Sequence, residues 1–524
     1  MSHDYPQKTV VQASTLEAKL ASRNAQITMV GVFGLLLILP LWLVKYPPLV
    51  DYPNHLARAF VLHHLNDPNY NFGHFFAPDW GLNPYCLADF LLQVFQHFVG
   101  IYAAGRLLLT VCILGLPLGV AFFLRRANPG NEYLALWAFA VAYNPNFLMG
   151  FMSFVLSVAL CFVVVGLWLD YLHTGQEKYW LMTLVLATLT FLTHLGGFAI
   201  AGMVIVLYTV LDAPVADLKI RNYMDLMGRL LMAGLAFVPG ASFLLYARLH
   251  GWAGRGPDYR HWSINLKLRG MTVPFREYSR TVEAITILAL LVTIGYFLSR
   301  RRELRLQFVW MAIVAAIVAL HWIVPDALGD LGFVDYRFCI FAFLFSLAIP
   351  VFRGPRIVPV ALATVVFLAH VLQAGTYFVS EQKHLQRLAN DFQYIPQKAL
   401  VLAYTSRGVG VPWEKQDDLH FWGYGVIERG WITPSLFHQS GVQPLQLRVP
   451  MYSDDDQYGD KLQERKYNEE SISKAYDYLW TTNVGYLNPY LEKMGNPVCS
   501  QGELQIIKTK KDQVAALARA RLSH

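Results

Sequence analysis

The chain alternates between long apolar runs and short polar turns from residue 27 to residue 379. A bilayer core needs about 20 apolar residues for each crossing helix, and about eleven runs approach that length. The expected spans are 27–45, 103–124, 133–148, 150–170, 179–194, 196–212, 230–249, 283–299, 307–324, 338–352 and 357–379. Several are short, so tilted or kinked helices are expected, and the division of 133–170 and 179–212 into helices is left open. The pattern predicts an α-helical polytopic membrane protein with about eleven transmembrane helices.

Composition supports this class and excludes others. Of 524 residues, 55% are hydrophobic and only 15% are charged, and the mean hydropathy is +0.35. Soluble globular domains carry about 25% charged residues. The sequence contains no Walker loop, no Gly-rich dinucleotide fingerprint and no nucleophile elbow, which argues against a nucleotide-driven pump.

Basic residues in the short loops predict the orientation. They fall on alternate turns, at Arg125, Arg126, Lys178, the 219–229 loop, Arg300–Arg302, Arg305, Arg353 and Arg356. Under the positive-inside rule these turns are cytoplasmic. The N-terminal segment 1–26 is then inside, and the first apolar run is retained because no small-residue cleavage site accompanies it. The long first loop 46–102, the loop 248–282 and all residues after 380 are expected outside.

The composition becomes polar after residue 380, where short periodic segments predict an α/β domain over 380–524. The expected elements are strands at 400–404, 483–487 and 503–507 and helices at 473–480 and 514–521. The chain is therefore divided into the N-terminal segment, a transmembrane domain over 27–379 and this extracytoplasmic domain.

The first outer loop begins with an unusual set of polar residues just after the first apolar run. Its sequence is Asp51-Tyr52-Pro53-Asn54-His55-Leu56-Ala57-Arg58. Apolar spacing over 51–65 predicts an amphipathic helix on the membrane surface. Asn54 and Arg58 then share one face, with His55 beside them. Asp51 would lie at the helix N-terminus, where capping is an alternative to catalysis, but capping explains neither His55 nor Arg58.

Other polar residues are expected at the same outer level, and most of them have more than one interpretation. Asp89 is either a helix cap or a metal or substrate ligand, and His194 is either a structural histidine or part of a site lining. Asn144 breaks the apolar pattern at that depth, where polar side chains usually face protein or water. Arg337 can bind a phosphate, pair with Asp335 or act as a snorkelling anchor.

The outer loop 248–282 carries an excess of positive charge, including Arg255 and Arg260. Positive charge on the translocated side runs against the usual bias. The loop therefore binds either an anionic substrate or anionic lipid headgroups.

The layout of the chain resembles the GT-C class of membrane glycosyltransferases. Three features carry this resemblance: the acidic residue of Asp51-Tyr52-Pro53-Asn54-His55 after the first helix, the long outer loop and the outer C-terminal domain. That class includes protein O-mannosyltransferases and lipid A aminoarabinose transferases and generally uses polyprenyl-phosphate-linked sugars. The pentapeptide is also similar to one in a group of bacterial membrane proteins assigned as glycosyltransferases. The resemblance implies the bacterial cytoplasmic (inner) membrane, a membrane-lipid environment and a glycolipid, polysaccharide or protein acceptor. No nucleic acid is expected as a partner.

Inverting transfer from a lipid phosphate needs a base for the acceptor hydroxyl and donors for the departing phosphate. Asp51 is the expected base. The expected phosphate or sugar contacts are Asn54, His55, Arg58, His194, Arg255, Arg260 and Arg337. Asp89 and Asn144 are candidates for the acceptor side or for a divalent metal such as Mg or Mn. Many GT-C enzymes have an acidic pair in the first loop, whereas Tyr52 follows Asp51 here, which puts metal dependence in doubt.

Two other functions remain open. A lipid or sugar transporter or flippase would carry ionisable residues near the bilayer midplane, whereas the polar groups here gather at the outer edge. A non-catalytic envelope-assembly protein would use the outer domain for binding and would not need Asp51.

Overall fold

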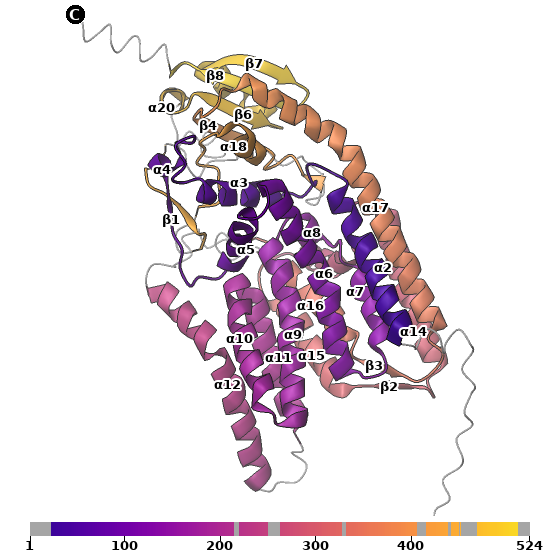
Figure 1. Cartoon of the computed structure of the whole chain (residues 1–524). Helices are drawn as coiled ribbons and strands as arrows, with labels where there is room; N and C mark the ends of the chain where they lie inside the picture. Colours follow the sequence, from indigo (N-terminus) through magenta and orange to yellow (C-terminus); the bar gives the residue numbers. More distant parts are fainter. Residues whose placement is uncertain are drawn as a thin grey trace, which may run out of the picture.

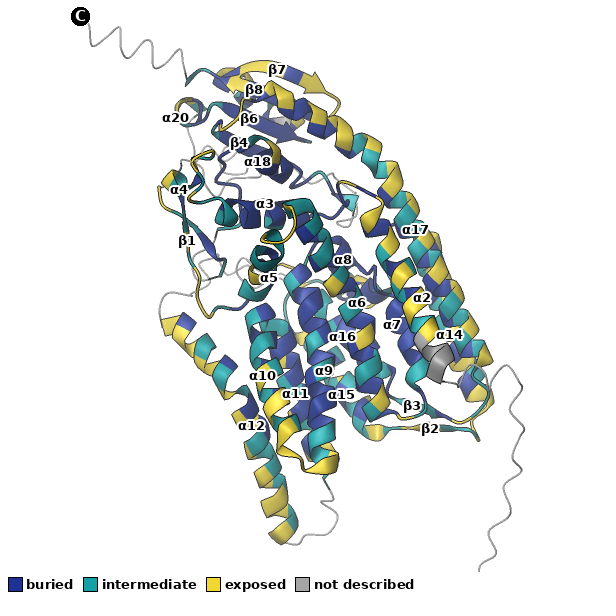
Figure 2. Cartoon of the chain, viewed as in Figure 1, coloured by how far each residue is buried: buried dark blue, intermediate teal, exposed yellow. Residues whose placement is uncertain are grey.

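The computed structural model describes residues 23–213, 220–249, 262–326, 332–405, 415–438, 442–449, 451 and 469–511. Most long helices form one bundle (Figure 1). They are α2 (Arg23–Trp42), α6 (Ile101–Ala127), α9 (Met152–Thr174), α10 (Glu177–Thr193), α11 (Leu195–Leu211), α12 (Ile220–Leu249), α14 (Arg280–Ser299), α15 (Phe308–Ile323), α16 (Tyr336–Ser346) and α17 (Ile357–Asn390). α9 packs on α6, α10 and α11 and is buried along most of its length, whereas α12 is mostly exposed or half-buried (Figure 2).

Five of the described helices are long and apolar enough to cross a membrane. They are α6, α9, α12, α14 and the continuous segment Ile357–Tyr394. Each expected span overlaps one of the bundle helices, with a single exception at 133–148.

That exception is a correction. The run 133–148 is divided into a 3-10 turn at Glu132–Ala135 and the short helices α7 (Leu136–Ala140) and α8 (Pro145–Leu148). Pro145 lacks a backbone N–H and favours the first turn of a helix. The Asn144 side chain accepts a hydrogen bond from Asn146 N and so caps α8. These two residues start a new helix where the hydrophobic pattern predicted a continuous one.

Residues after α17 build a four-stranded sheet in the order β4-β6-β8-β7. Its strands are β4 (Val401–Thr405), β6 (Tyr478–Thr482), β8 (Leu504–Thr509) and β7 (Gly495–Gln501), with helices α18 (Gly423–Arg429), α20 (Glu469–Ala475) and α21 (Asn488–Met494). β4 is parallel to β6, and the other pairs are antiparallel. Figure 1 shows this sheet at one end of the helix bundle.

Two elements expected here are wrong, and one lies outside the described residues. The helix expected over 473–480 ends at Ala475, and Trp480 lies in β6. β6 is buried at every position, so its aromatic and β-branched residues show no period-2 alternation. The strand expected at 483–487 is a turn with a 3-10 helix at Gly485–Leu487. The expected strands 400–404 and 503–507 correspond to β4 and β8, and the expected helix 514–521 is not among the described residues.

The boundary expected at residue 380 falls inside a helix, because α17 continues to Asn390. The leucines near its end, Leu385 and Leu388, are buried. The separate extracytoplasmic domain over 380–524 stays a prediction.

The first loop forms a layer between the bundle and the sheet (Figure 1). It contains α3 (Tyr52–His63), α4 (Phe72–Phe75), β1 (Phe76–Pro78) and α5 (Cys86–Gln96). α3 confirms the helix expected over 51–65, but most of its residues are buried against other parts of the protein, so its position on the membrane surface stays a prediction. β1 pairs antiparallel with β5 (Leu445–Leu447), and α3 packs on α18. The first loop is thus joined to the C-terminal part of the chain.

Candidate functional site

The position of Asp51 is fixed by the turn that precedes α9. The backbone N–H of Asp51 donates to Met149 O at 3.0 Å, and that of Val50 donates to Leu148 O at 3.2 Å. Gly150 has a φ of +78°, and a Cβ added there would lie 2.7 Å from the backbone nitrogen of Tyr52. Only glycine permits both this conformation and this close approach. The backbone that carries Asp51 is therefore held on the helix bundle.

The Asp51 side chain faces the C-terminal part of the chain. Asp51 occupies the N-cap position of α3 but makes no side-chain capping hydrogen bond. Its Oδ1 lies 3.4 Å from Nε2 of His420, and the side chain is 19% exposed. Capping therefore does not account for this carboxylate, and a ligand can still reach it.

The segment that carries His420 is clamped onto the start of α3. Asn54 Nδ2 donates to Ser435 O at 3.1 Å, and Asn54 Oδ1 accepts from Phe437 N at 2.9 Å. Gly423 lies so close that an added Cβ would be 2.6 Å from Pro53 O. Asn54, expected to contact the donor, thus binds two backbone groups of its own chain. These bonds tie the 435–437 segment to α3, and the ring of Phe437 lies 5.3 Å from that of His420.

Arg58 and Asp89 form a buried ion pair between α3 and α5. Arg58 Nε and Nη2 donate to Asp89 Oδ1 at 3.0 and 2.9 Å, and Nη2 also donates to Oδ2 at 2.8 Å. Both side chains are 2% exposed. The sequence predicted that Arg58 would contact the donor phosphate or sugar and that Asp89 would contact the acceptor or a metal ion. In the structure each neutralises the other.

His55 lies beside this pair and is a neutral hydrogen-bond donor. Arg58 Nη2 lies 2.9 Å from His55 Nδ1, and because a guanidinium only donates, Nδ1 accepts and the ring proton is on Nε2. Burial, then the neighbouring Arg58 and His420, hold the pKa of the imidazole well below its usual range. The His55 ring also contacts that of Phe437 at a centroid distance of 5.2 Å.

Arg337 and His194 meet on the opposite side of the site. Nη1 of Arg337 lies 3.2 Å from His194 Nε2, while His194 Nδ1 accepts from Gly196 N at 2.9 Å. With Nδ1 accepting, a neutral imidazole carries its proton on Nε2. Two donors then face each other, and an anion between them would accept from both. Arg337 stacks on Phe151, two residues after Met149, whose carbonyl accepts from the Asp51 backbone, so Arg337 and Asp51 are both held by the turn that precedes α9.

Arg337 has no carboxylate partner among the residues that the structure describes. Asp335, the expected alternative partner, is instead bound by Lys267 at 2.8 Å. The guanidinium lies over the rings of Phe151 and Phe154, at 4.8 and 5.4 Å from their centroids, and its Nε is buried without a hydrogen-bond partner. A half-buried cation without a counter-ion is a site for an anion.

Of three other expected contacts, one has a local structural role and two lie outside the described residues. The Asn144 side chain donates to the carbonyl of Val141 and caps α8, so its amide serves the local fold. Arg255 and Arg260 lie outside the described residues, and their expected role stays a prediction.

His420 and Tyr85 were missed by sequence reasoning. Tyr85, at the N-cap of α5, has a φ of +79°, which is uncommon for a residue with a Cβ, and its ring is 4.7 Å from that of His194. No motif marks either residue. The one signal for His420 was its place in an aromatic segment, which also contains the buried core residues Trp422 and Trp431.

The described part of the chain contains no set of side chains that would bind the expected divalent metal ion. No group of three His, Cys, Asp or Glu side chains there could hold a metal ion. Mg²⁺ and Mn²⁺ prefer several oxygen ligands, whereas Asp51 faces an imidazole and Asp89 is bound by Arg58. The residues present do not fit such an ion, and we derive no step through one.

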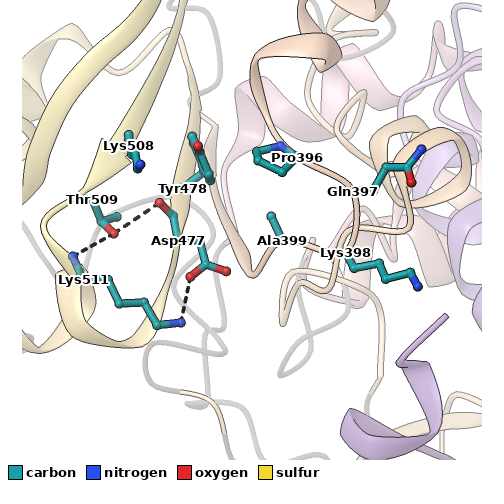
Figure 3. Close-up of a pocket in the computed structure, with 9 residues that line it drawn as sticks. All are labelled: Pro396, Gln397, Lys398, Ala399, Asp477, Tyr478, Lys508, Thr509 and Lys511. Atoms are coloured by element: carbon teal, nitrogen blue, oxygen red, sulfur yellow. Dashed lines mark hydrogen bonds and ion pairs between the residues drawn. The ribbon is translucent and has the colours of Figure 1, made fainter. Parts of the chain in front are cut away.

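A pocket of about 310 Å³ lies at the edge of the four-stranded sheet (Figure 3). It is lined by the connection into β4, by the start of β6 and by the end of β8, including Lys398, Asp477 and Lys508. Both carboxylate oxygens of Asp477 already have partners within the protein. Oδ1 lies 2.8 Å from Lys511 Nζ, and Oδ2 accepts a hydrogen bond from Leu400 N at 2.8 Å. The pocket shares no residue with the Asp51 site.

Comparison with known proteins identifies the fold. No protein-family model matches this sequence, and no curated protein matches it. Two crystal structures of ArnT from Cupriavidus metallidurans are similar over 93% of this chain, each at 12% identity. The structure bound to undecaprenyl phosphate matches over 98% of its own length with a TM-score of 0.54, and the apo structure over 99% with a TM-score of 0.57. Together with the apolar helices, this likeness shows a multi-pass membrane protein with an ArnT-like fold.

Proposed function

We propose that this protein is a membrane glycosyltransferase of the GT-C type that transfers a sugar from a polyprenyl-phosphate donor to an acceptor hydroxyl. The observation that carries the proposal is the placement of Arg337, a cation with no carboxylate partner among the described residues, on Phe151, in the turn that also holds the backbone of the partly exposed Asp51. The ArnT-like fold supports it, since one of the two ArnT structures is bound to undecaprenyl phosphate. The expected location is the outer face of the bacterial cytoplasmic membrane.

Asp51 acts as the general base in this proposal. Its carboxylate accepts the proton of the acceptor hydroxyl as the acceptor oxygen bonds to the anomeric carbon. The bond between that carbon and the phosphate oxygen breaks, and its electron pair leaves with the lipid phosphate. Attack opposite the leaving group inverts the anomeric centre. His420 orients the carboxylate from 3.4 Å away.

The leaving phosphate is stabilised in this proposal by two groups that have no carboxylate partner among the described residues. Arg337 supplies a cation stacked on two phenylalanine rings, and His194 supplies its Nε2–H beside it. His55 adds a neutral donor near Asp51. Fixed donors in a partly desolvated site stabilise developing negative charge more strongly than water does.

Arg58, Asp89, Asn54 and Asn144 take structural roles in this account, because Arg58 and Asp89 bind each other and the two amides bind backbone groups of the protein. Nη1 of Arg58 is buried without a hydrogen-bond partner among the described residues. The sugar and the acceptor class, whether glycolipid, polysaccharide or protein, are to be identified by experiment.

The test compares envelope glycolipids, polysaccharides and glycoproteins by mass spectrometry in four strains. These express wild type, Asp51→Asn, Asp67→Asn or no protein, with protein levels matched. Asp67 is a carboxylate of the same loop that accepts from Asn69 N and serves as the control. We expect one glycoform to fall by about 100-fold or more in Asp51→Asn and in the deletion, but not in Asp67→Asn. A glycoform present in Asp51→Asn and absent in the deletion would instead favour a transporter or an assembly protein.

A further inference from the structure

His55 lies one helical turn after Asp51 in α3. Its backbone N–H donates to Asp51 O at 3.1 Å, and side chains with this spacing share one face of a helix. The ring of Phe437 contacts both His55 and His420, at centroid distances of 5.2 and 5.3 Å. His55 therefore lies beside the contact between Asp51 and His420.

Arg58 reaches Asp89 and His55 with the same guanidinium. Its Nε and Nη2 donate to the two carboxylate oxygens of Asp89, and such a two-point contact fixes the plane of the guanidinium. Nη2 carries two hydrogens, so it can also donate to His55 Nδ1, which lies 2.9 Å away. The carboxylate on α5 thus sets the position of the donor that His55 receives.

The hydrogen bond from Arg58 determines which form His55 takes. A neutral imidazole carries its proton on one of two nitrogens, and the hydrogen bond at one nitrogen selects the state of the other. Because a guanidinium cannot accept, Nδ1 accepts and Nε2 carries the proton. Without that donor, the proton could move to Nδ1, and Nε2 would then accept a hydrogen bond instead of donating one. Such a ring would not stabilise negative charge on a departing phosphate.

We propose that Arg58 is a positioning residue that keeps His55 as an Nε2–H donor beside Asp51. Asp89 holds Arg58 in place for that contact. The inference rests on the proposed function, in which His55 is a neutral donor to the leaving phosphate, and deepens it. Neither Arg58 nor Asp89 touches the substrate in this account, and their ion pair also joins α3 to α5.

The first test removes the ion pair without leaving a buried charge. Arg58→Met combined with Asp89→Leu replaces both charged side chains by apolar ones, a change that often preserves stability. Binding of undecaprenyl phosphate and of undecaprenol, which lacks the phosphate, is measured on the full-length protein in detergent. We expect this pair variant and His55→Phe each to bind undecaprenyl phosphate about tenfold more weakly, with undecaprenol unchanged. Adding His55→Phe to the pair variant should weaken binding further by less than about threefold, because both changes remove the same donor.

The second test observes the imidazole of His55 directly and needs no ligand. Nitrogen NMR of protein with isotope-labelled histidine distinguishes a protonated ring nitrogen from an unprotonated one, and the His55 signals are those absent from His55→Phe. Wild type should show one form, with Nδ1 unprotonated and Nε2 protonated. The pair variant should show a mixture of forms or a protonated Nδ1. If Arg58 only joined α3 to α5, the His55 signals of a folded pair variant would not change.

An ion pair elsewhere in the bundle provides the matched control. Arg126, in the last turn of α6, lies 2.6 Å from Asp170 of α9. Arg126→Met combined with Asp170→Leu removes a pair of the same kind and should change neither the lipid affinities nor the His55 signals. If the variant of Arg58 and Asp89 does not fold, Arg58→Lys carries the same tests. Its ammonium keeps a charge beside Asp89 but lacks the planar fork that reaches both groups.

Four results would overturn the inference. The pair variant could bind undecaprenyl phosphate as tightly as wild type, could lose affinity for both lipids alike, could add its full effect to that of His55→Phe, or could leave the His55 signals unchanged. Each leaves the proposed function standing. A wild-type protein that does not distinguish the two lipids would overturn the phosphate site itself and, with it, the role given to His55.

Discussion

Arg58 lies within α3 and Arg337 at the start of α16, and sequence reasoning gave both the same role as contacts to the donor phosphate or sugar. The structure separates them by their partners. Arg58 is bound through two nitrogens by Asp89, and the pair is 2% exposed. Arg337 stacks on Phe151 and Phe154, and the described residues supply it with no carboxylate. A guanidinium can bind an anionic ligand when the fold places no carboxylate beside it. The residue type alone does not show whether such a carboxylate is present.

The comparison predicts its largest effect on stability at Arg58. Arg58→Met should lower the free energy of unfolding by about 3–5 kcal/mol, because it leaves Asp89 buried and charged without a partner. Thermal unfolding of the purified protein in detergent measures this. Arg58→Met combined with Asp89→Leu should recover most of the loss. A single variant as stable as wild type would mean that the pair does not hold α3 on α5.

Arg337 should show the reverse behaviour. Arg337→Gln should reduce transfer by about 100-fold or more, the order found when one fixed donor to a developing anion is removed. Its free energy of unfolding should change by less than about 1 kcal/mol, because no buried partner is abandoned. Initial rates in membrane preparations and unfolding of the same samples give both values. Unchanged rates with a large loss of stability would make Arg337 a second structural arginine.

A smaller effect on stability is expected at Asp417, a carboxylate for which the described residues supply no cationic partner. Asp417 is 6% exposed, and its Oδ2 is buried with no hydrogen-bond partner in the described structure. Burial, then the carboxylates of Glu381 and Asp418, raise the pKa of Asp417 well above its usual range. The folded state therefore binds this proton more tightly than the unfolded state does, and stability is lost as pH rises from about 4 towards the raised pKa.

Asp417→Asn should accordingly stabilise the protein at neutral pH, by on the order of 1 kcal/mol. The asparagine stays neutral, so the difference from wild type should vanish near pH 4 and grow as pH rises. Unfolding of both proteins at several pH values checks this. A constant difference at all pH values would show that Asp417 does not titrate in this range.

Much of the fold follows from hydrophobic pattern alone. The runs that became α6, α9 and α17 are long and apolar, and α3 was recognised by its helical spacing. The pattern failed at 133–148, where Asn144 and Pro145 start a new helix inside an apolar run. It failed again at β6, because a strand buried on both faces carries the same continuous apolar signal as a helix.

The site was predicted less completely, for a different reason. Asp51 and His55 could be found because they stand together in one loop. The contact between Asp51 and His420 could not, because nothing local to either residue records the pairing. The same holds for Lys267 and Asp335, which lie on separate elements. Sequence reasoning finds polar residues at the right depth, but only the tertiary structure shows which charges are already neutralised.

The central claim is that a lipid phosphate binds between Arg337 and His194, close to Asp51. The most direct measurement is photo-cross-linking with undecaprenyl phosphate that carries a photoreactive group on the isoprene unit next to the phosphate, followed by peptide mapping. We predict labelled peptides from the start of α16 and the turn between α10 and α11. Unlabelled undecaprenyl phosphate should compete for the labelling, and undecaprenol should not. Labelling centred on the sheet-edge pocket, or equal competition by both lipids, would contradict the account.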